Sequence, residues 1–88
     1  MMQKELIVQN RLGLHARPAA LVVSEASKFR SEIHLSKDEV EINAKSIMGV
    51  MMLAAEMGSS IQVTACGEDE QQAIEALEAL FASKFDED

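Results

Sequence analysis

The chain contains 88 residues, enough for a single domain over residues 1–88 and too few for two domains. Apolar residues make up 48% and charged residues 26%, a composition typical of globular rather than disordered chains. The net charge of -7 argues against a nucleic-acid-binding protein, and the single cysteine excludes an internal disulfide and a zinc–thiolate cluster. Because no signal region opens the chain and no apolar run is long enough for membrane insertion, we expect a cytoplasmic protein.

The charge is unevenly distributed along the chain. Between Gln9 and Ser31 there are four basic residues and one acidic residue, a local net charge of +3. Between Glu68 and Asp88 there are eight acidic residues and one lysine, a local net charge of -7. The first region should therefore attract an anionic ligand or an acidic partner, whereas the end of the chain from Phe85 onward is interpreted as a solvated tail.

The first predicted elements are a strand, a helix and a hairpin. Residues 4–9 form a short apolar run typical of a strand. From Pro18 the apolar side chains recur with helical spacing as far as Phe29. Residues 32–35 and 39–43 then alternate between polar and apolar side chains, which predicts two strands joined by a polar turn.

The next segment, IMGVMMLAAEM at residues 47–57, is predicted to be a helix. Ser46 precedes it as an N-cap, and Gly58 follows it as a residue that ends a helix. Gly49 inside the segment indicates that the helix is short or imperfect. We expect some of its methionines to pack in the core and others to form an adaptable docking surface. These methionines are Met48, Met51, Met52 and Met57.

A further strand and a last helix complete the predicted order. Residues 61–66 alternate again, with Cys66 expected to be buried or half-buried at the strand end. Residues 67–70 supply a turn and an acidic first turn for a helix that reaches Phe81. The order β-α-β-β-α-β-α favours an α+β fold in which one four-stranded antiparallel sheet carries its helices on a single face.

His15 stands just upstream of the first predicted helix, close to Arg17 and Pro18. Pro18 suits a first turn, but it should push Arg17 away from helical geometry and leave residues 15–17 irregular and exposed. Free N–H groups at a helix start bind anions, and Gly13 allows a close approach of the chain. A neutral imidazole there can act as a nucleophile, with the guanidinium offsetting the charge of a phosphoryl group. The alternative is an ordinary surface or capping histidine.

Two motifs carry a resemblance to a known family. GLHARPAA at residues 13–20 and NAKSIMGVMML at residues 43–53 together resemble the HPr family, the phosphocarriers of the bacterial phosphoenolpyruvate-dependent phosphotransferase system. The resemblance implies an open-faced β-sandwich with a four-stranded antiparallel sheet and three helices on one face. It also implies that His15 accepts a phosphoryl group on Nδ1 from phosphorylated enzyme I and passes it to IIA-type domains. Arg17 and Pro18 then match the arginine and proline of the family.

The resemblance also assigns roles around the second motif. It matches Ser46 to the serine phosphorylated by HPr kinase/phosphorylase, although its value as an N-cap is sufficient to explain a serine there. We expect Val50 and Leu53 to pack inward. The partner-binding residues that it implies are Ile47, Met48 and Met51 at an apolar centre and Arg11, Arg17 and Lys45 at a basic rim.

The sequence favours a carrier over an enzyme with turnover of its own. We find no metal-ligand cluster, no cofactor motif, no paired carboxylates near His15 and no second nucleophile, and we expect a monomer. The alternative is a mainly regulatory relative, controlled through Ser46 phosphorylation or nitrogen-branch signalling rather than serving sugar transport. The segments NRLGLHARPAA and ALFASKFDED are similar to that nitrogen-related branch, called NPr. Leu12 departs from the small or polar residue common in sugar-type relatives.

Overall fold

The computed structural model describes residues 1–87. Its elements are β1 (Met2–Ile7), α1 (Ala16–Ala26), β2 (Glu32–Lys37), β3 (Val40–Asn43), α2 (Ile47–Met52), β4 (Ser60–Cys66), α3 (Glu70–Ala82) and the 3-10 turn η1 (Lys84–Asp86). The predicted order of strands and helices is therefore confirmed. Within these residues no helix is long and apolar enough to cross a membrane.

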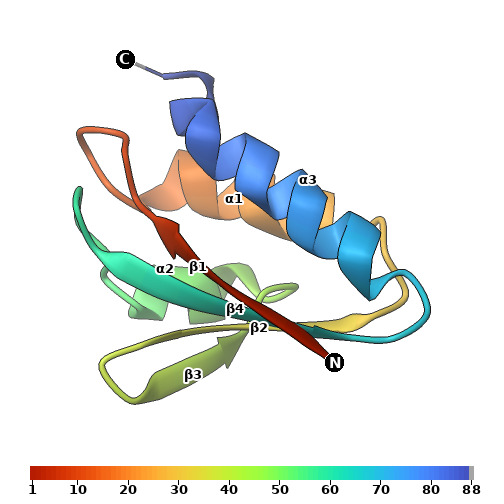
Figure 1. Cartoon of the computed structure of the whole chain (residues 1–88). Helices are drawn as coiled ribbons and strands as arrows, with labels where there is room; N and C mark the ends of the chain where they lie inside the picture. Colours follow the sequence, from red (N-terminus) through yellow and green to blue (C-terminus); the bar gives the residue numbers. More distant parts are fainter. Residues whose placement is uncertain (88) are drawn as a thin grey trace.

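The four strands form one antiparallel sheet in the order β1-β4-β2-β3. α1 and α3 lie side by side across one face of it, as Figure 1 shows. The alternation predicted from the sequence places Ile33 and Leu35 of β2 and Ile61 and Val63 of β4 in the core between sheet and helices. The α+β fold expected from the pattern, with an antiparallel sheet and helices on one face, is confirmed.

α1 begins two residues earlier than predicted and ends at Ala26 rather than near Phe29. Pro18 is its third residue, and the prediction that it keeps Arg17 out of the helix is wrong. The N–H groups of a first helical turn have no partner within the helix, so a proline there removes no hydrogen bond. The N–H of Ala19 donates to the carbonyl of His15 at 2.9 Å and closes that turn.

α2 is short, as Gly49 indicated, but Gly58 does not end it. The chain leaves the helix after Met52 and turns at Ala54, whose φ is 49°. The carbonyl of Ala55 then accepts a hydrogen bond from the N–H of Leu14 at 2.9 Å. This contact with the loop before α1 takes the chain away from the helical path, so the local pattern of residues 53–57 does not decide where α2 ends.

Three further expectations need correction. β1 lies at residues 2–7 rather than 4–9, and Cys66 is exposed on the uncovered side of the sheet rather than buried. The hairpin between β2 and β3 turns at Asp38 and Glu39, with φ of 50° and 70°. Two left-handed residues match the twist of the strands, and the turn forms here without the glycine that usually supplies them.

The expectation of a solvated tail from Phe85 onward is wrong for Phe85 and Glu87. Phe85 is fully buried and packs against Phe81 of α3, with ring centroids 5.0 Å apart. Residues 84–86 all have positive φ, which turns the chain back toward the start of α1. The turn therefore brings Glu87 to the region of His15, while Asp88 lies outside the described residues.

Candidate functional site

His15 is the N-cap of α1 and leaves the helix start open. Its backbone is extended, with φ -75° and ψ -171°, and its side chain makes no capping hydrogen bond. The N–H groups of the first turn are therefore not occupied by the residue that precedes them. The ring itself is 37% exposed, so it lies within reach of a molecule that approaches this end of the helix.

The loop before α1 is held against the segment that follows α2. Gly13 has φ of 73°, and a Cβ atom at this position would lie 2.3 Å from the carbonyl oxygen of Ala55. The close approach expected of Gly13 is thus present, and a side chain here would collide with backbone. The contact fixes the start of α1 beside α2.

A carboxylate lies next to the imidazole. Nε2 of His15 is 3.0 Å from Oε1 of Glu87 and 3.3 Å from Oε2, and Nη1 of Arg17 donates to Oε2 at 3.4 Å. Arg17 is therefore paired with a carboxylate. Glu87 is a single carboxylate at His15, not the pair of carboxylates that the sequence was found to lack. Arg17 is nevertheless exposed, as predicted.

Asn10 completes this group of side chains, and sequence reasoning missed it. It is fully buried, and its Nδ2 donates to the carbonyl of Gly13 at 2.7 Å and to Oε1 of Glu87 at 2.8 Å. Among residues 1–87 its Oδ1 has no hydrogen-bond partner. The hydrogen bonds from Asn10 and then His15 hold the pKa of Glu87 below its usual range, so its carboxylate is ionised at neutral pH. No local pattern signals this contact.

The second predicted site residue, Ser46, caps α2. Its Oγ accepts a hydrogen bond from the N–H of Gly49 at 3.1 Å, which confirms the N-cap prediction. Lys45 beside it is half-buried, and its Nζ donates to the carbonyl of Phe29 at 2.8 Å. The side chain of Lys45 therefore lies along the protein surface instead of extending into solvent.

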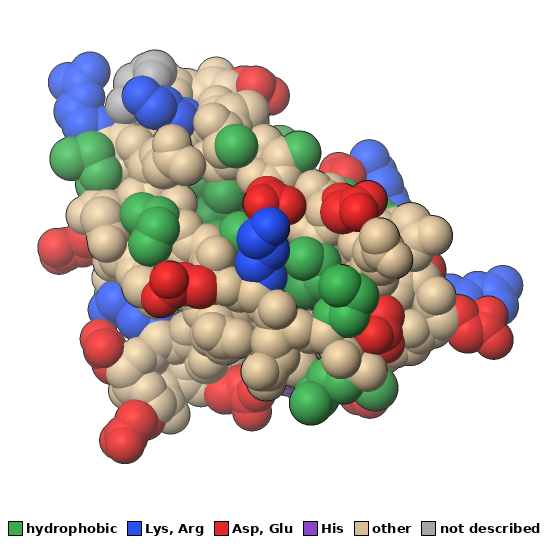
Figure 2. All heavy atoms as spheres, viewed as in Figure 1, with side chains coloured by type: hydrophobic (Ala, Val, Ile, Leu, Met, Phe, Trp, Pro, Cys, Tyr) green, Lys and Arg blue, Asp and Glu red, His purple; other side chains and the backbone are tan. Residues whose placement is uncertain are grey.

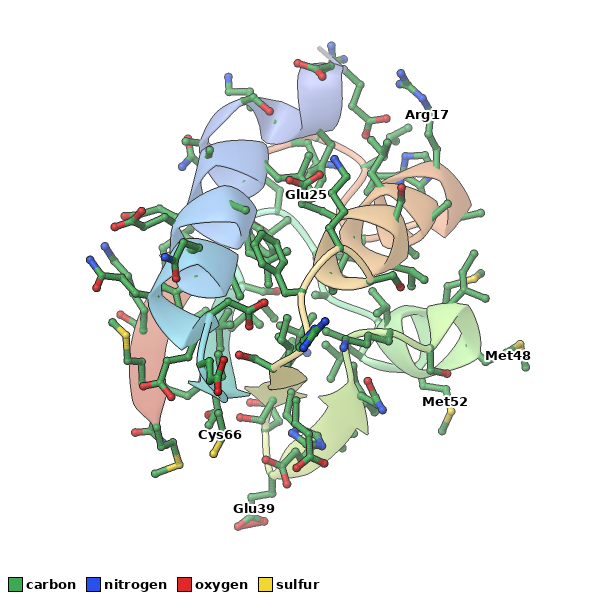
Figure 3. All side chains as sticks on the ribbon, turned by 90° about the vertical axis from the view of Figure 1, so that its right-hand side faces the viewer. Arg17, Glu25, Glu39, Met48, Met52 and Cys66 are labelled. Carbon is green, nitrogen blue, oxygen red and sulfur yellow. The ribbon has the colours of Figure 1, made fainter. Side chains whose placement is uncertain are left out.

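The residues of α2 divide as the resemblance implied. Val50 and Leu53 are buried, whereas Ile47, Met48 and Met51 are exposed. All four methionines named above are exposed, so the expectation that some pack in the core is wrong. Figure 3 shows Met48 and Met52 on α2 projecting on the same side of the molecule as Arg17 on α1. We call Ile47, Met48, Met51 and Met52 the apolar surface of α2.

The surroundings of this site mix both charges. Arg11 and Leu12 are exposed in the loop before α1. Elsewhere, on the face seen in Figure 2, acidic and basic side chains are interspersed. The separation of charge along the sequence is therefore not kept as two blocks on that face. Residues 1–87 contain no cluster of histidine, cysteine and carboxylate side chains arranged to hold a metal ion.

Comparisons with known proteins show the family of this chain. A family model described as the PTS HPr component phosphorylation site matches residues 2–83. The phosphocarrier protein HPr of Xylella fastidiosa strain 9a5c is 54% identical over 88 residues, covering 100% of this chain and 99% of the relative. The phosphocarrier protein NPr of Proteus mirabilis is 44% identical and covers 97% of this chain and 96% of the relative.

A solved structure shows the same architecture. The crystal structure of HPr from Thermoanaerobacter tengcongensis aligns with a TM-score of 0.96 at 49% sequence identity, covering 100% of this chain and 99% of that one. The matched family region includes both motifs, with His15 and Ser46 at the starts of α1 and α2. This chain therefore belongs to the HPr family of phosphocarrier proteins of the phosphotransferase system.

Proposed function

We propose that this chain is a cytoplasmic carrier that accepts a phosphoryl group on Nδ1 of His15 from phosphorylated enzyme I and passes it to IIA-type domains. The observation that carries the proposal is the half-exposed imidazole at the open start of α1. Its Nε2 contacts Glu87, while Nδ1 makes no hydrogen bond within residues 1–87. When Nε2 of a neutral imidazole is hydrogen-bonded through its proton, Nδ1 keeps a lone pair and can act as the nucleophile.

Arg17 is the residue that we assign to the transferred group. Arg17 lies on the first turn of α1, and its guanidinium contacts the same Glu87 carboxylate as the ring. Charge-assisted hydrogen bonds to phosphate oxygens are among the stronger polar contacts in proteins. The open helix start adds partial positive charge on the same side. The site is exposed rather than enclosed, so one protein can deliver the phosphoryl group and another can remove it. This exposure favours a carrier without turnover of its own.

The partners dock, in this proposal, on the apolar surface of α2. Exposed methionines adapt to more than one partner surface, and a carrier needs at least a donor and an acceptor. Arg11 and Arg17 supply basic charge at the edge of that surface. Lys45 takes a smaller part than the sequence implied, because its Nζ is bound to the carbonyl of Phe29.

Ser46 is the position at which this docking can be regulated. Its hydroxyl is at an exposed helix start directly before Ile47, and a phosphate there brings roughly −2 charge to the apolar surface of α2. The helix start accommodates that charge, so the fold is kept while docking is weakened. HPr kinase/phosphorylase is the enzyme class that the resemblance assigns to this step.

Labelling of His15 tests the carrier function. Incubation with enzyme I and phosphoenolpyruvate should add one acid-labile, base-stable phosphate, detected by mass spectrometry. His15→Ala should abolish the label, and His34→Ala, which removes the other histidine from β2, is the matched control and should keep it. A label that persists in His15→Ala contradicts the proposal. IIA domains of the sugar type and of the nitrogen type, offered side by side, then identify the acceptor.

A further inference from the structure

The segment that carries Glu87 is anchored independently of His15. Phe85 is fully buried against Phe81, and the N–H of Glu87 donates to the carbonyl of Lys84 at 3.1 Å. Nδ2 of Asn10, which is fully buried, donates a hydrogen bond to the Glu87 carboxylate. As a result the Glu87 side chain is only 14% exposed. The position of the carboxylate is thus fixed by contacts other than the one to His15. A group that orients a side chain must itself be held in position.

The contact between Glu87 and His15 determines which ring nitrogen carries the proton. An ionised carboxylate has acceptors only, so a hydrogen bond to it requires a proton on Nε2. Neutral imidazole carries a single ring proton, and Nδ1 is then left with its lone pair. The geometry therefore selects the tautomer in which Nδ1 is the nucleophile.

We propose that Glu87 is a positioning residue for phosphoryl transfer: its carboxylate keeps the proton on Nε2 of His15, frees Nδ1 to accept the phosphoryl group and stabilises the charged ring that results. The inference rests on the proposed function. It assigns a role to the acidic end of the chain, which sequence reasoning interpreted as solvated.

The transfer step balances without a further reactant. The lone pair of Nδ1 forms a bond to the phosphorus of the donor, and the bond from phosphorus to the donor breaks with its electron pair returning to the donor. No proton leaves the ring, so the ring becomes positively charged while Nε2 keeps its proton. Oε1 of Glu87, at 3.0 Å from Nε2, stabilises that cation. On transfer to an acceptor, the electron pair of the Nδ1–phosphorus bond returns to Nδ1.

Arg17 is the other charged group described at this carboxylate. Its Nη1 is 3.4 Å from Oε2 and its side chain is 59% exposed, so this contact is weaker than the one from Nε2. The guanidinium can turn to the phosphoryl oxygens while Glu87 stays on the ring. An exposed ion pair between Arg17 and Glu87 alone would not explain the additional hydrogen bond from buried Asn10.

Substitutions of Glu87 separate its charge from its shape. Glu87→Gln keeps the size and one acceptor oxygen but removes the charge, and Glu87→Ala removes the acceptor. Asp86→Asn, a charge removed from the neighbouring exposed residue, is the matched control. We measure kcat and KM of enzyme I with phosphoenolpyruvate and each variant as the phosphoryl acceptor. We expect kcat to fall about fivefold for Glu87→Gln and further for Glu87→Ala, while KM stays the same. For Asp86→Asn both constants should equal those of wild type.

Nitrogen NMR of the His15 ring supplies a second measurement. At alkaline pH the wild-type ring should be almost entirely the tautomer protonated on Nε2, and Glu87→Ala should give a mixture of both tautomers. A changed tautomer with wild-type kcat would make the contact structural and overturn the proposal, as would wild-type kcat and tautomer in both variants. Wild-type protein that takes no phosphate on His15 would instead overturn the proposed function itself.

Discussion

The starts of α1 and α2 differ in how their N-terminal residues use their side chains. Ser46 folds its hydroxyl back onto the N–H of Gly49, whereas His15 makes no capping bond and turns its ring to Glu87. Both residues have extended backbone, with φ of -75° for His15 and -114° for Ser46. The chemistry of the two side chains, rather than the backbone, therefore leaves one helix open and closes the other.

The lengths of the two helices explain why this difference is tolerated. α1 has 11 residues and buries Pro18, Ala19, Val22 and Ala26, so its packing stabilises it without a cap. α2 has six residues and buries only Val50 among them. An N-cap contributes about 1 kcal/mol, which matters more to the shorter helix. A helix that packs well can leave its first turn available to a phosphoryl group.

The largest effect is expected from closing the open helix. His15→Asn places a good capping residue at the start of α1 and removes the nucleophile. Phosphorylation by enzyme I should be lost completely, while the free energy of unfolding should exceed that of His15→Ala by about 1 kcal/mol. Both variants lose the contact with Glu87, so the difference between them in urea denaturation isolates the cap. Equal stability would show that the start of α1 is not open to capping.

A smaller effect is expected from changes at the closed helix. Ser46→Asp should slow phosphorylation of His15 several-fold, because it brings negative charge to the apolar surface of α2 while still capping the helix. Ser46→Asn caps without the charge and is the matched control, so its transfer rate should equal that of wild type. Ser46→Ala should keep that rate and lose about 1 kcal/mol of stability. A slow Asn variant would mean that the hydroxyl, not the charge, matters.

The start of α3 gives a third arrangement, and a change there should leave phosphoryl transfer unaltered. Its N-cap, Asp69, turns its carboxylate away from the helix to the Oγ of Ser31 and the N–H groups of Arg30 and Ser31. The hydrogen bond from the Ser31 side chain and that from the N–H of Arg30 lower the pKa of Asp69. A carboxyl with a lowered pKa in the folded state stabilises the fold above its unfolded pKa, and this contribution is lost as the pH falls through the folded pKa.

Asp69→Asn should therefore lower stability at neutral pH, and its deficit relative to wild type should shrink as the solution is acidified. Chemical denaturation at a series of pH values measures this, with Glu68→Gln, an exposed neighbour, as the control. A deficit that stays constant with pH would show that the ionised form of Asp69 is not what the fold uses.

The features predicted correctly depend on neighbours in sequence. Alternation of polar and apolar residues predicted the strands, and the inward packing of Val50 and Leu53 was implied by the family motif. The capping role of Ser46 follows from its place directly before Ile47. His15 and Arg17 are two positions apart in the motif GLHARPAA, so the sequence already places them near each other. These predictions hold because helical spacing, strand alternation and caps are set by nearby residues.

The sequence by itself thus determined the order of the elements, the antiparallel sheet and the residues that stand at the two helix starts. Only the tertiary structure decided that Glu87 meets His15, from 72 positions away, and that Asn10 holds both this carboxylate and the loop at Gly13. Burial of Phe85 brings Glu87 inward, although the composition of this segment is typical of solvated tails. Local patterns report the preferences of neighbouring residues, whereas such contacts depend on which distant surfaces must pack together to exclude water.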